Sequence, residues 1–243
     1  MIEAIKLKKQ FGRVTAVEDA SFLAEDGVVT GLLGHNGAGK TTTMRMITGL
    51  VHPDSGTVLV DNVPLADDPL GARGKMGVLP DTRGLYPRLT TREHIAYFAE
   101  LQAVPSGILK QRVAEILDIL GMQSIADRPV EGFSQGERTK VAIARALVHN
   151  PNNVLLDEPT NGLDVMSTLA VREVIRALKA QGRCVIFSSH IMQEVAALCD
   201  RIVVLGQGRV LINATPEELM ARTGRDTLEE AFLALATQEE AIP

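Results

Sequence analysis

Residues 34–41 read Gly-His-Asn-Gly-Ala-Gly-Lys-Thr, and this stretch decides the prediction of the fold. It matches every fixed position of the phosphate-loop pattern GxxxxGK[ST]. An apolar run at residues 28–33 leads into it, and residues 42–50 have the character of a helix leading out. Strand, glycine loop and helix in this order form the setting in which such a loop binds phosphate. The stretch therefore predicts a nucleotide-binding unit in an α/β protein, against the alternative of a glycine-rich turn without a ligand.

The residue types of the loop indicate how it would bind a nucleotide. Its glycines allow a tight turn that points backbone N–H groups inward, and the positive end of the following helix attracts phosphate. Lys40 would reach the β- and γ-phosphates, and Thr41 would hold Mg²⁺. The predicted nucleotide contacts are Gly34, Asn36, Gly37, Gly39, Lys40, Thr41 and Thr42, with Lys40 also assigned to catalysis.

Composition favours one globular domain in a reducing compartment. The 243 residues are 45% hydrophobic and 23% charged, which is ordinary for a globular protein. No apolar run approaches the ~20 residues of a membrane span, and residues 1–9 lack a signal-peptide pattern. The net charge of −5 argues against nucleic acid as a partner, because phosphate backbones bind basic surfaces. Two cysteines without metal-ligand spacing fit a cytoplasmic protein.

Strands and helices alternate along most of the chain. Strands are predicted at residues 2–10, 14–23, 28–33, 56–60, 75–79, 154–157, 184–188, 202–205 and 209–212, and helices at 42–50, about 90–103, 108–120, 134–149, 165–181 and 191–199. This alternation predicts a mostly parallel sheet covered on both faces. The helices within residues 83–150 indicate an inserted subdomain, and residues 213–243 end the chain with capped helices. We expect a single domain over residues 1–243.

The segment Leu155-Leu156-Asp157-Glu158 is the second candidate site. An apolar strand that ends in a carboxylate can present Asp157 to Mg²⁺ beside the phosphates. Glu158 would then lie near the γ-phosphate, where a carboxylate can deprotonate the attacking water. The structural alternative is an ordinary strand followed by a solvated acidic turn.

Two further motifs are weaker when taken alone. Ser188-Ser189-His190 follows a predicted strand, so His190 could contact the γ-phosphate or serve a structural role. Residues 132–137 read Gly-Phe-Ser-Gln-Gly-Glu, in which Ser134 and Glu137 form a capping box. The start of such a helix is a generic anion site and equally a generic helix start.

Taken together, the order of these motifs resembles the ATPase subunit of ABC transporters. The run Asp-Glu-Pro-Thr-Asn-Gly-Leu-Asp at residues 157–164 is the most specific part, and the resemblance covers essentially the whole chain. It implies a P-loop NTPase (RecA-like) core with an antiparallel β subdomain and an inserted helical subdomain. It also implies hydrolysis of ATP with Mg²⁺, a separate membrane permease, and a place at the cytoplasmic face of the cell membrane.

The resemblance also implies a site shared between two ATPase subunits that pair head to tail, most simply as a homodimer. Ser134 and Gly136 would contact the γ-phosphate bound by the other subunit. Asp164 would belong to the loop that links the two sites. His190 would support the attacking water, and Phe11 would occupy the position of the aromatic residue that stacks on adenine.

The chain departs from the family pattern in two places. The signature usually reads Leu-Ser-Gly-Gly-Gln, and Phe133, Gln135 and Glu137 differ from it. A carboxylate should repel phosphate, although a capping box would fold Glu137 back onto the cap. The loop after residues 75–79 usually carries a Gln that contacts Mg²⁺ or water. Asp81 stands there, and it could accept a hydrogen bond from metal-bound water.

The finer match, at residues 81–86, 162–167 and 188–201, is similar to the NatA-type subunits associated with sodium export. Nothing in the chemistry of the chain selects sodium, because the ion path would lie in another polypeptide. The alternatives are an exporter of a drug or lipid, or a non-transport ABC ATPase that acts on nucleic acid or the ribosome. A P-loop kinase would leave residues 157–164 unexplained.

Overall fold

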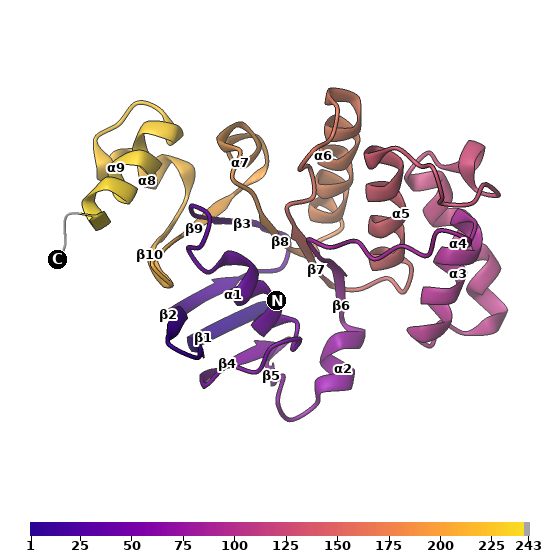
Figure 1. Cartoon of the computed structure of the whole chain (residues 1–243), viewed down its shortest axis with the longest axis horizontal. Coiled ribbons are helices and arrows are strands. Elements are labelled where there is room, and N and C mark those ends of the chain that lie inside the picture. The colour runs from indigo at the N-terminus through magenta and orange to yellow at the C-terminus, as the bar shows by residue number, and fades with distance from the viewer. Residues whose placement is uncertain (241–243) are drawn as a thin grey trace.

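One continuous β-sheet organises the chain (Figure 1). The computed structural model describes residues 1–240, and in them the strand order is β5-β4-β1-β2-β10-β9-β3-β8-β7-β6. The strands are β1 (Ile2–Phe11), β2 (Val14–Ala24), β3 (Val29–Leu33), β4 (Ser55–Val60), β5 (Val63–Pro64), β6 (Met76–Leu79), β7 (Asn153–Asp157), β8 (Cys184–Ser188), β9 (Arg201–Gly206) and β10 (Arg209–Ala214). The helices are α1 (Lys40–Ile47), α2 (Pro69–Gly74), α3 (Thr91–Leu101), α4 (Ser106–Ile119), α5 (Gln135–Leu147), α6 (Val165–Ala180), α7 (Met192–Leu198), α8 (Pro216–Thr223) and α9 (Leu228–Glu240), with a short 3₁₀ turn at Gln123–Ile125.

The central strands are parallel and buried. β3 pairs with β8 and β9, and β7 pairs with β8 and β6, all in parallel register. Every residue of β3, β7 and β8 is buried, as expected of a parallel sheet with both faces covered. The carboxyl ends of these strands therefore meet at one edge of the sheet.

Alternating side chains of the central strands enter two separate cores. Val185 and Phe187 of β8 face the core that α5, α6 and α7 cover. Cys184 and Ile186 of the same strand face the other core, with α1 and the strands β1, β2 and β4. The period-two alternation of a strand thus anchors both layers to one sheet.

An antiparallel region completes the sheet. β1 pairs with β2 and β4, β4 pairs with β5, and β9 pairs with β10, all antiparallel. The prediction of a mostly parallel sheet therefore holds for the centre, while this region covers one face of it together with α1. The α/β class with an antiparallel β part is confirmed.

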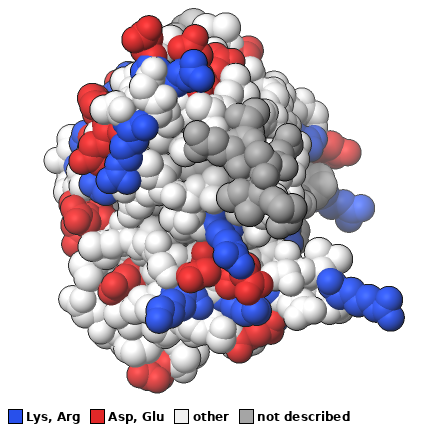
Figure 2. All heavy atoms as spheres, turned by 90° about the vertical axis from the view of Figure 1, so that its left-hand side faces the viewer, with Lys and Arg blue, Asp and Glu red and all other residues white. Residues whose placement is uncertain are grey.

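The helices after β6 form a compact group. α3 packs against α4 and α5, and α5 packs against β6 and α6, at the right of Figure 1. At the opposite end, α8 packs against α9 and β10. Figure 2 shows the molecule from that end, and acidic and basic side chains are mixed on the visible face without a patch of one sign.

Several element ends differ from the sequence predictions. α1 begins at Lys40, inside the phosphate loop, and ends before Gly49, whose φ of +69° leaves the helical region. β5 and α2 were not predicted. Asp68 caps α2 through a hydrogen bond from the Gly71 N–H at 2.9 Å, and Pro69 occupies its first turn. The pair Asp68-Pro69 was therefore a readable helix-start signal.

The cap of α6 yields a test of local stability. One carboxylate oxygen of Asp164 accepts the Ser167 N–H at 2.9 Å and the other accepts the Ser167 hydroxyl at 2.7 Å. These hydrogen bonds lower the pKa of the Asp164 carboxyl. Asp164→Ala should reduce the free energy of unfolding, as measured by urea denaturation, because both cap hydrogen bonds are lost. Asp164→Asn, which keeps a capping oxygen, is the matched control, and equal losses in both variants would contradict the capping role.

Candidate nucleotide site

The phosphate loop joins the buried end of β3 to α1. Gly39 adopts a φ of +103°, and a Cβ there would meet the Ala16 carbonyl oxygen at 2.7 Å. A Cβ on Gly34 would meet the Leu205 carbonyl oxygen at 2.5 Å. Only glycine satisfies these two positions, because one needs a left-handed backbone and both lie against neighbouring main chain.

The backbone N–H groups at the start of α1 and the Lys40 ammonium are the groups of the loop that could bind an anion. No side chain caps the start of α1, so its first N–H groups have no side-chain acceptor. The Lys40 ammonium donates to the carbonyl oxygens of Gly34 at 2.7 Å and His35 at 3.2 Å. Burial lowers the pKa of Lys40, and the negative charges of Glu158 and Asp157 oppose that shift. A bound phosphate would place a counter-charge in direct contact with this buried cation.

Asp157 lies at the end of β7, only 6% exposed, and accepts the Ser188 hydroxyl at 2.6 Å. Burial raises the pKa of its carboxyl, and the Asp81 charge acts in the same direction. Hydrogen bonds from Ser188 and Thr41 act in the opposite direction. A desolvated carboxylate beside a hydroxyl and a second carboxylate is an arrangement that a hard divalent cation would stabilise. These residues therefore fit Mg²⁺.

Glu158 and His190 form a pair at the mouth of the site. The His190 Nδ1 lies 2.9 Å from a carboxylate oxygen of Glu158. The Glu158 side chain is 16% exposed and that of His190 is 50% exposed. The carboxylate is thus held at the surface of the site, where water has access, and the ring can orient it.

One hollow of about 680 Å³ collects most of the predicted residues. Its walls include predicted residues from four separate segments, namely Asn36, Gly37, Gly39, Lys40, Thr41, Thr42, Asp81, Glu158 and His190. The hollow is also lined by four residues that were not among the predicted site residues, namely Val14, Thr15, Ala16 and Asn161. Asn161 belonged to the most specific motif, whereas the start of β2 carried no chemical signal.

Phe11 does not line this hollow. It is 50% exposed at the end of β1, with the Lys9 ammonium 5.5 Å from the centre of its ring. Its register partner in the hairpin is Val14, which does line the hollow. The stacking of adenine on Phe11 stays a prediction.

Ser134, Gly136 and Asp164 also lie outside the hollow, at the starts of α5 and α6. A Cβ on Gly136 would meet the Ser167 hydroxyl at 2.2 Å, so glycine allows the two helix starts to approach. The capping box is present as predicted, because Glu137 accepts the Ser134 N–H at 2.8 Å. Glu137 also lies 3.6 Å from the Arg128 guanidinium. The signature carboxylate is therefore folded back onto its own helix.

Comparison with known proteins points to one family. A family model described as "ABC transporter" matches residues 17–161. The chain is 41% identical over 222 residues to the "ABC transporter ATP-binding protein NatA" of Bacillus subtilis (strain 168), covering 91% of this chain and 90% of that protein. It is 38% identical to the "Linearmycin resistance ATP-binding protein LnrL" of the same organism, covering 96% of this chain and 78% of that protein.

The fold agrees with this assignment. A solved structure described as "Structure of ATP binding subunit of ABC transporter" superposes with a TM-score of 0.89 at 30% sequence identity. The match covers 97% of this chain and 99% of that one. This chain therefore belongs to the ABC transporter family, in which it is an ATP-binding and ATP-hydrolysing subunit that resembles NatA.

Proposed function

We propose that this chain hydrolyses Mg-ATP to power export of sodium ions through a separate membrane subunit, at the cytoplasmic face of the membrane. One observation carries the proposal: the phosphate loop, Glu158 and His190 line one hollow, while Ser134 and Gly136 of the same chain do not line it. Every helix within residues 1–240 is too short or too polar to cross a bilayer. The membrane path would then come from a partner.

The separation of Ser134 and Gly136 from the hollow supports a head-to-tail dimer. A second subunit would bring its own signature helix over the nucleotide and complete the site. Val165 and Met166, which follow Asp164, are 75% and 74% exposed. Apolar side chains of this size at the start of α6 suit a surface that a second copy covers.

Mg²⁺ would be held by Thr41 and Asp157, with Asp81 next to them. Within residues 1–240, no three His, Cys, Asp or Glu side chains gather as a metal cage, which suits an ion held largely by phosphate oxygens. The bound ion would neutralise charge on the phosphates. Glu158 would take a proton from the attacking water while His190 holds its carboxylate.

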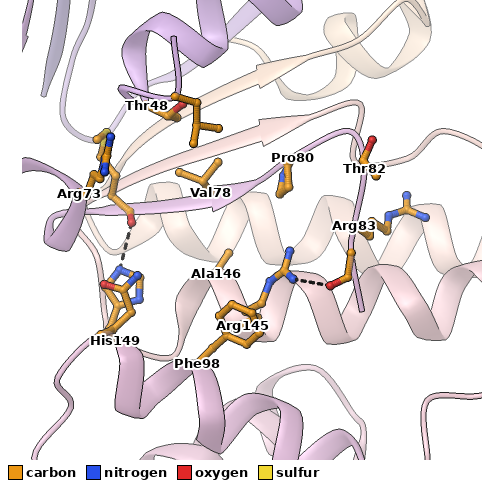
Figure 3. A pocket seen from close by; sticks show the side chains of 14 residues that line it. Thr48, Arg73, Val78, Pro80, Thr82, Arg83, Phe98, Arg145, Ala146 and His149 are labelled. Carbon is orange, nitrogen blue, oxygen red and sulfur yellow. Dashed lines mark hydrogen bonds between the residues drawn. The ribbon is translucent and has the colours of Figure 1, made fainter. Parts of the chain in front are cut away.

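A groove beside the helical group is the proposed docking place for the membrane subunit (Figure 3). Its volume is about 430 Å³, and Leu50, Val78 and Phe98 give it an apolar floor. The Arg145 guanidinium lies 4.7 Å from the Phe98 ring and donates to the Gly84 carbonyl oxygen at 3.4 Å. Residues 83–150 would thus act as the subdomain that receives motion or transmits it.

Two arginines that line the groove, Arg83 and Arg145, indicate the charge of the partner segment that would bind there. Burial lowers the pKa of Arg145, and among the described residues no carboxylate forms a salt bridge with it. Burial also lowers the pKa of Arg83, and Asp81 opposes that shift. An apolar segment that carries a carboxylate would complement this groove.

Two kinds of cargo are candidates for the transporter. Sodium follows from the likeness to NatA-type subunits, whereas LnrL is named for resistance to linearmycin. Export of a drug or lipid is therefore the second candidate. The mixed charges of the face in Figure 2 lend no support to a nucleic-acid partner.

Replacement of Glu158 tests the catalytic part. Glu158→Gln should lower ATP turnover by about 10²–10⁴-fold, because the base is lost, while the affinity for ATP persists because Lys40 and the loop are intact. Turnover is measured by phosphate release and affinity by fluorescent-nucleotide titration. Turnover within a few-fold of the wild type would refute the assignment.

The same variant serves as the control for transport. In inverted vesicles that contain the co-purified membrane subunit, Mg-ATP should drive uptake of radioactive sodium with the wild type and not with Glu158→Gln. ATP-dependent uptake of an amphiphilic dye without sodium uptake would replace sodium by a drug as cargo.

Complementation tests the shared site. Lys40→Ala removes the phosphate ligand, and Ser134→Asp keeps a helix cap while placing a carboxylate where phosphate would approach. Each variant alone should be inactive. In a head-to-tail mixture, one site joins the intact loop of the Ser134→Asp chain to the intact signature helix of the Lys40→Ala chain, so turnover should reappear. Inactive mixtures in which heterodimers are demonstrated would exclude the shared arrangement.

The groove is tested with Arg145. Arg145→Ala should release the membrane subunit during affinity purification, whereas Arg145→Lys should retain most of it because the charge remains. Arg92→Ala is the matched control, since Arg92 is exposed and paired with Asp127 at 2.8 Å on the same helical group. Equal retention by all variants would remove Arg145 from the interface.

A further inference from the structure

Ser188 is a buried hydroxyl that neither the motifs nor the family assignment gives a role. It ends β8 and is fully buried. In the parallel register of β7 and β8, its partner is Asp157. The sheet therefore places this hydroxyl beside the proposed metal ligand and next to the peptide that begins the proposed base.

Two hydrogen bonds fix the orientation of the Ser188 hydroxyl. It lies 2.6 Å from a carboxylate oxygen of Asp157 and 2.9 Å from the Glu158 backbone nitrogen. A hydroxyl has one hydrogen, and the carboxylate is the acceptor that takes it. The Ser188 oxygen therefore accepts the Glu158 N–H. One side chain thus connects the metal-binding carboxylate to the main chain of the base.

The backbone of Glu158 needs such support. Its φ is +48°, in the left-handed region that a residue with a Cβ rarely adopts. A strained conformation of this kind persists only where its surroundings hold it in place. The hydrogen bond to Ser188 is an anchor of this kind, and it lies one residue beyond the end of the β7 ladder.

We propose that Ser188 is a positioning residue for hydrolysis, an inference that rests on the proposed role of Glu158 as the base. The Ser188 hydroxyl holds Glu158 in its left-handed conformation and ties it to Asp157. The Glu158 carboxylate then stays at the mouth of the site, next to His190. Without the hydroxyl, the Glu158 N–H and one Asp157 oxygen both lose a buried partner. Both side-chain hydrogen bonds of Ser188 go to residues 157 and 158 and not to the phosphate loop, so we expect its loss to act on turnover more than on ATP affinity.

Three substitutions at position 188 test this role by separating kcat from KM. Ser188→Ala and Ser188→Cys should lower kcat about ten- to hundredfold, because a base displaced by a fraction of an ångström loses its alignment with water. KM for ATP and the affinity for ADP should change less than about threefold. Ser188→Thr, which keeps the hydroxyl, should restore most of kcat. Ser188→Cys fills the same space with a weak hydrogen-bonding group, so it remains informative if Ser188→Ala does not fold.

A matched control and a second measurement exclude a merely structural effect. Thr30→Val removes another fully buried hydroxyl, which has no hydrogen-bond partner among the described residues. This variant should leave kcat within about twofold of the wild-type value. In nucleotide-free protein, the Glu158 amide should exchange slowly with solvent deuterium in the wild type and Ser188→Thr, and faster in Ser188→Ala and Ser188→Cys. Wild-type kcat in Ser188→Ala, unchanged amide exchange, or an equal loss in Ser188→Thr would each overturn the proposal.

Discussion

The parallel register of β3, β8 and β7 is the constraint on which the site depends. Ser188 of β8 is the register partner of Leu32 on one side and of Asp157 on the other. The phosphate loop, the acidic pair and the Ser-Ser-His segment therefore leave the sheet at the same edge. Because parallel strands require covered faces, the two cores that bury them also exclude water from beneath the charges. Lys40 and Asp157 are consequently desolvated, each with a pKa that burial shifts toward its neutral form.

Both shifts have the same physical cause, which is desolvation of a charged group. A buried ammonium and a buried carboxylate are both costly without a partner of opposite charge. Phosphate complements the first, and a divalent cation complements the second. Within the chain, the Lys40 ammonium donates to loop carbonyl groups and the Ser188 hydroxyl donates to Asp157. The local positive charge of the loop and Lys40, and not the net charge of the chain, is therefore what a phosphate group would meet.

Residues that lie at strand ends were predictable, and residues brought in by distant pairing were not. In the sequence, an apolar strand ends at or shortly before each of four residues: Lys40, Asp157, Glu158 and His190. The sequence alone therefore predicted that they lie at one edge of the sheet. The wall formed by residues 14–16 depends instead on the turn between β9 and β10, where the Gly208 carbonyl accepts the Glu18 N–H at 2.7 Å. No local pattern encodes that contact. Ser188 illustrates the same limit, because its role arises only from the register with β7.

The departure at Glu137 is compatible with phosphate recognition for a related reason. Its carboxylate is occupied by the Ser134 N–H and lies near Arg128, so part of its charge is already neutralised. The Ser134 oxygen accepts the Glu137 N–H at 3.2 Å, which uses a lone pair and leaves the hydroxyl hydrogen free. That hydrogen is the group a γ-phosphate from another subunit would need. The capping box thus turns the acidic side chain of Glu137 back onto the Ser134 N–H at the start of its own helix.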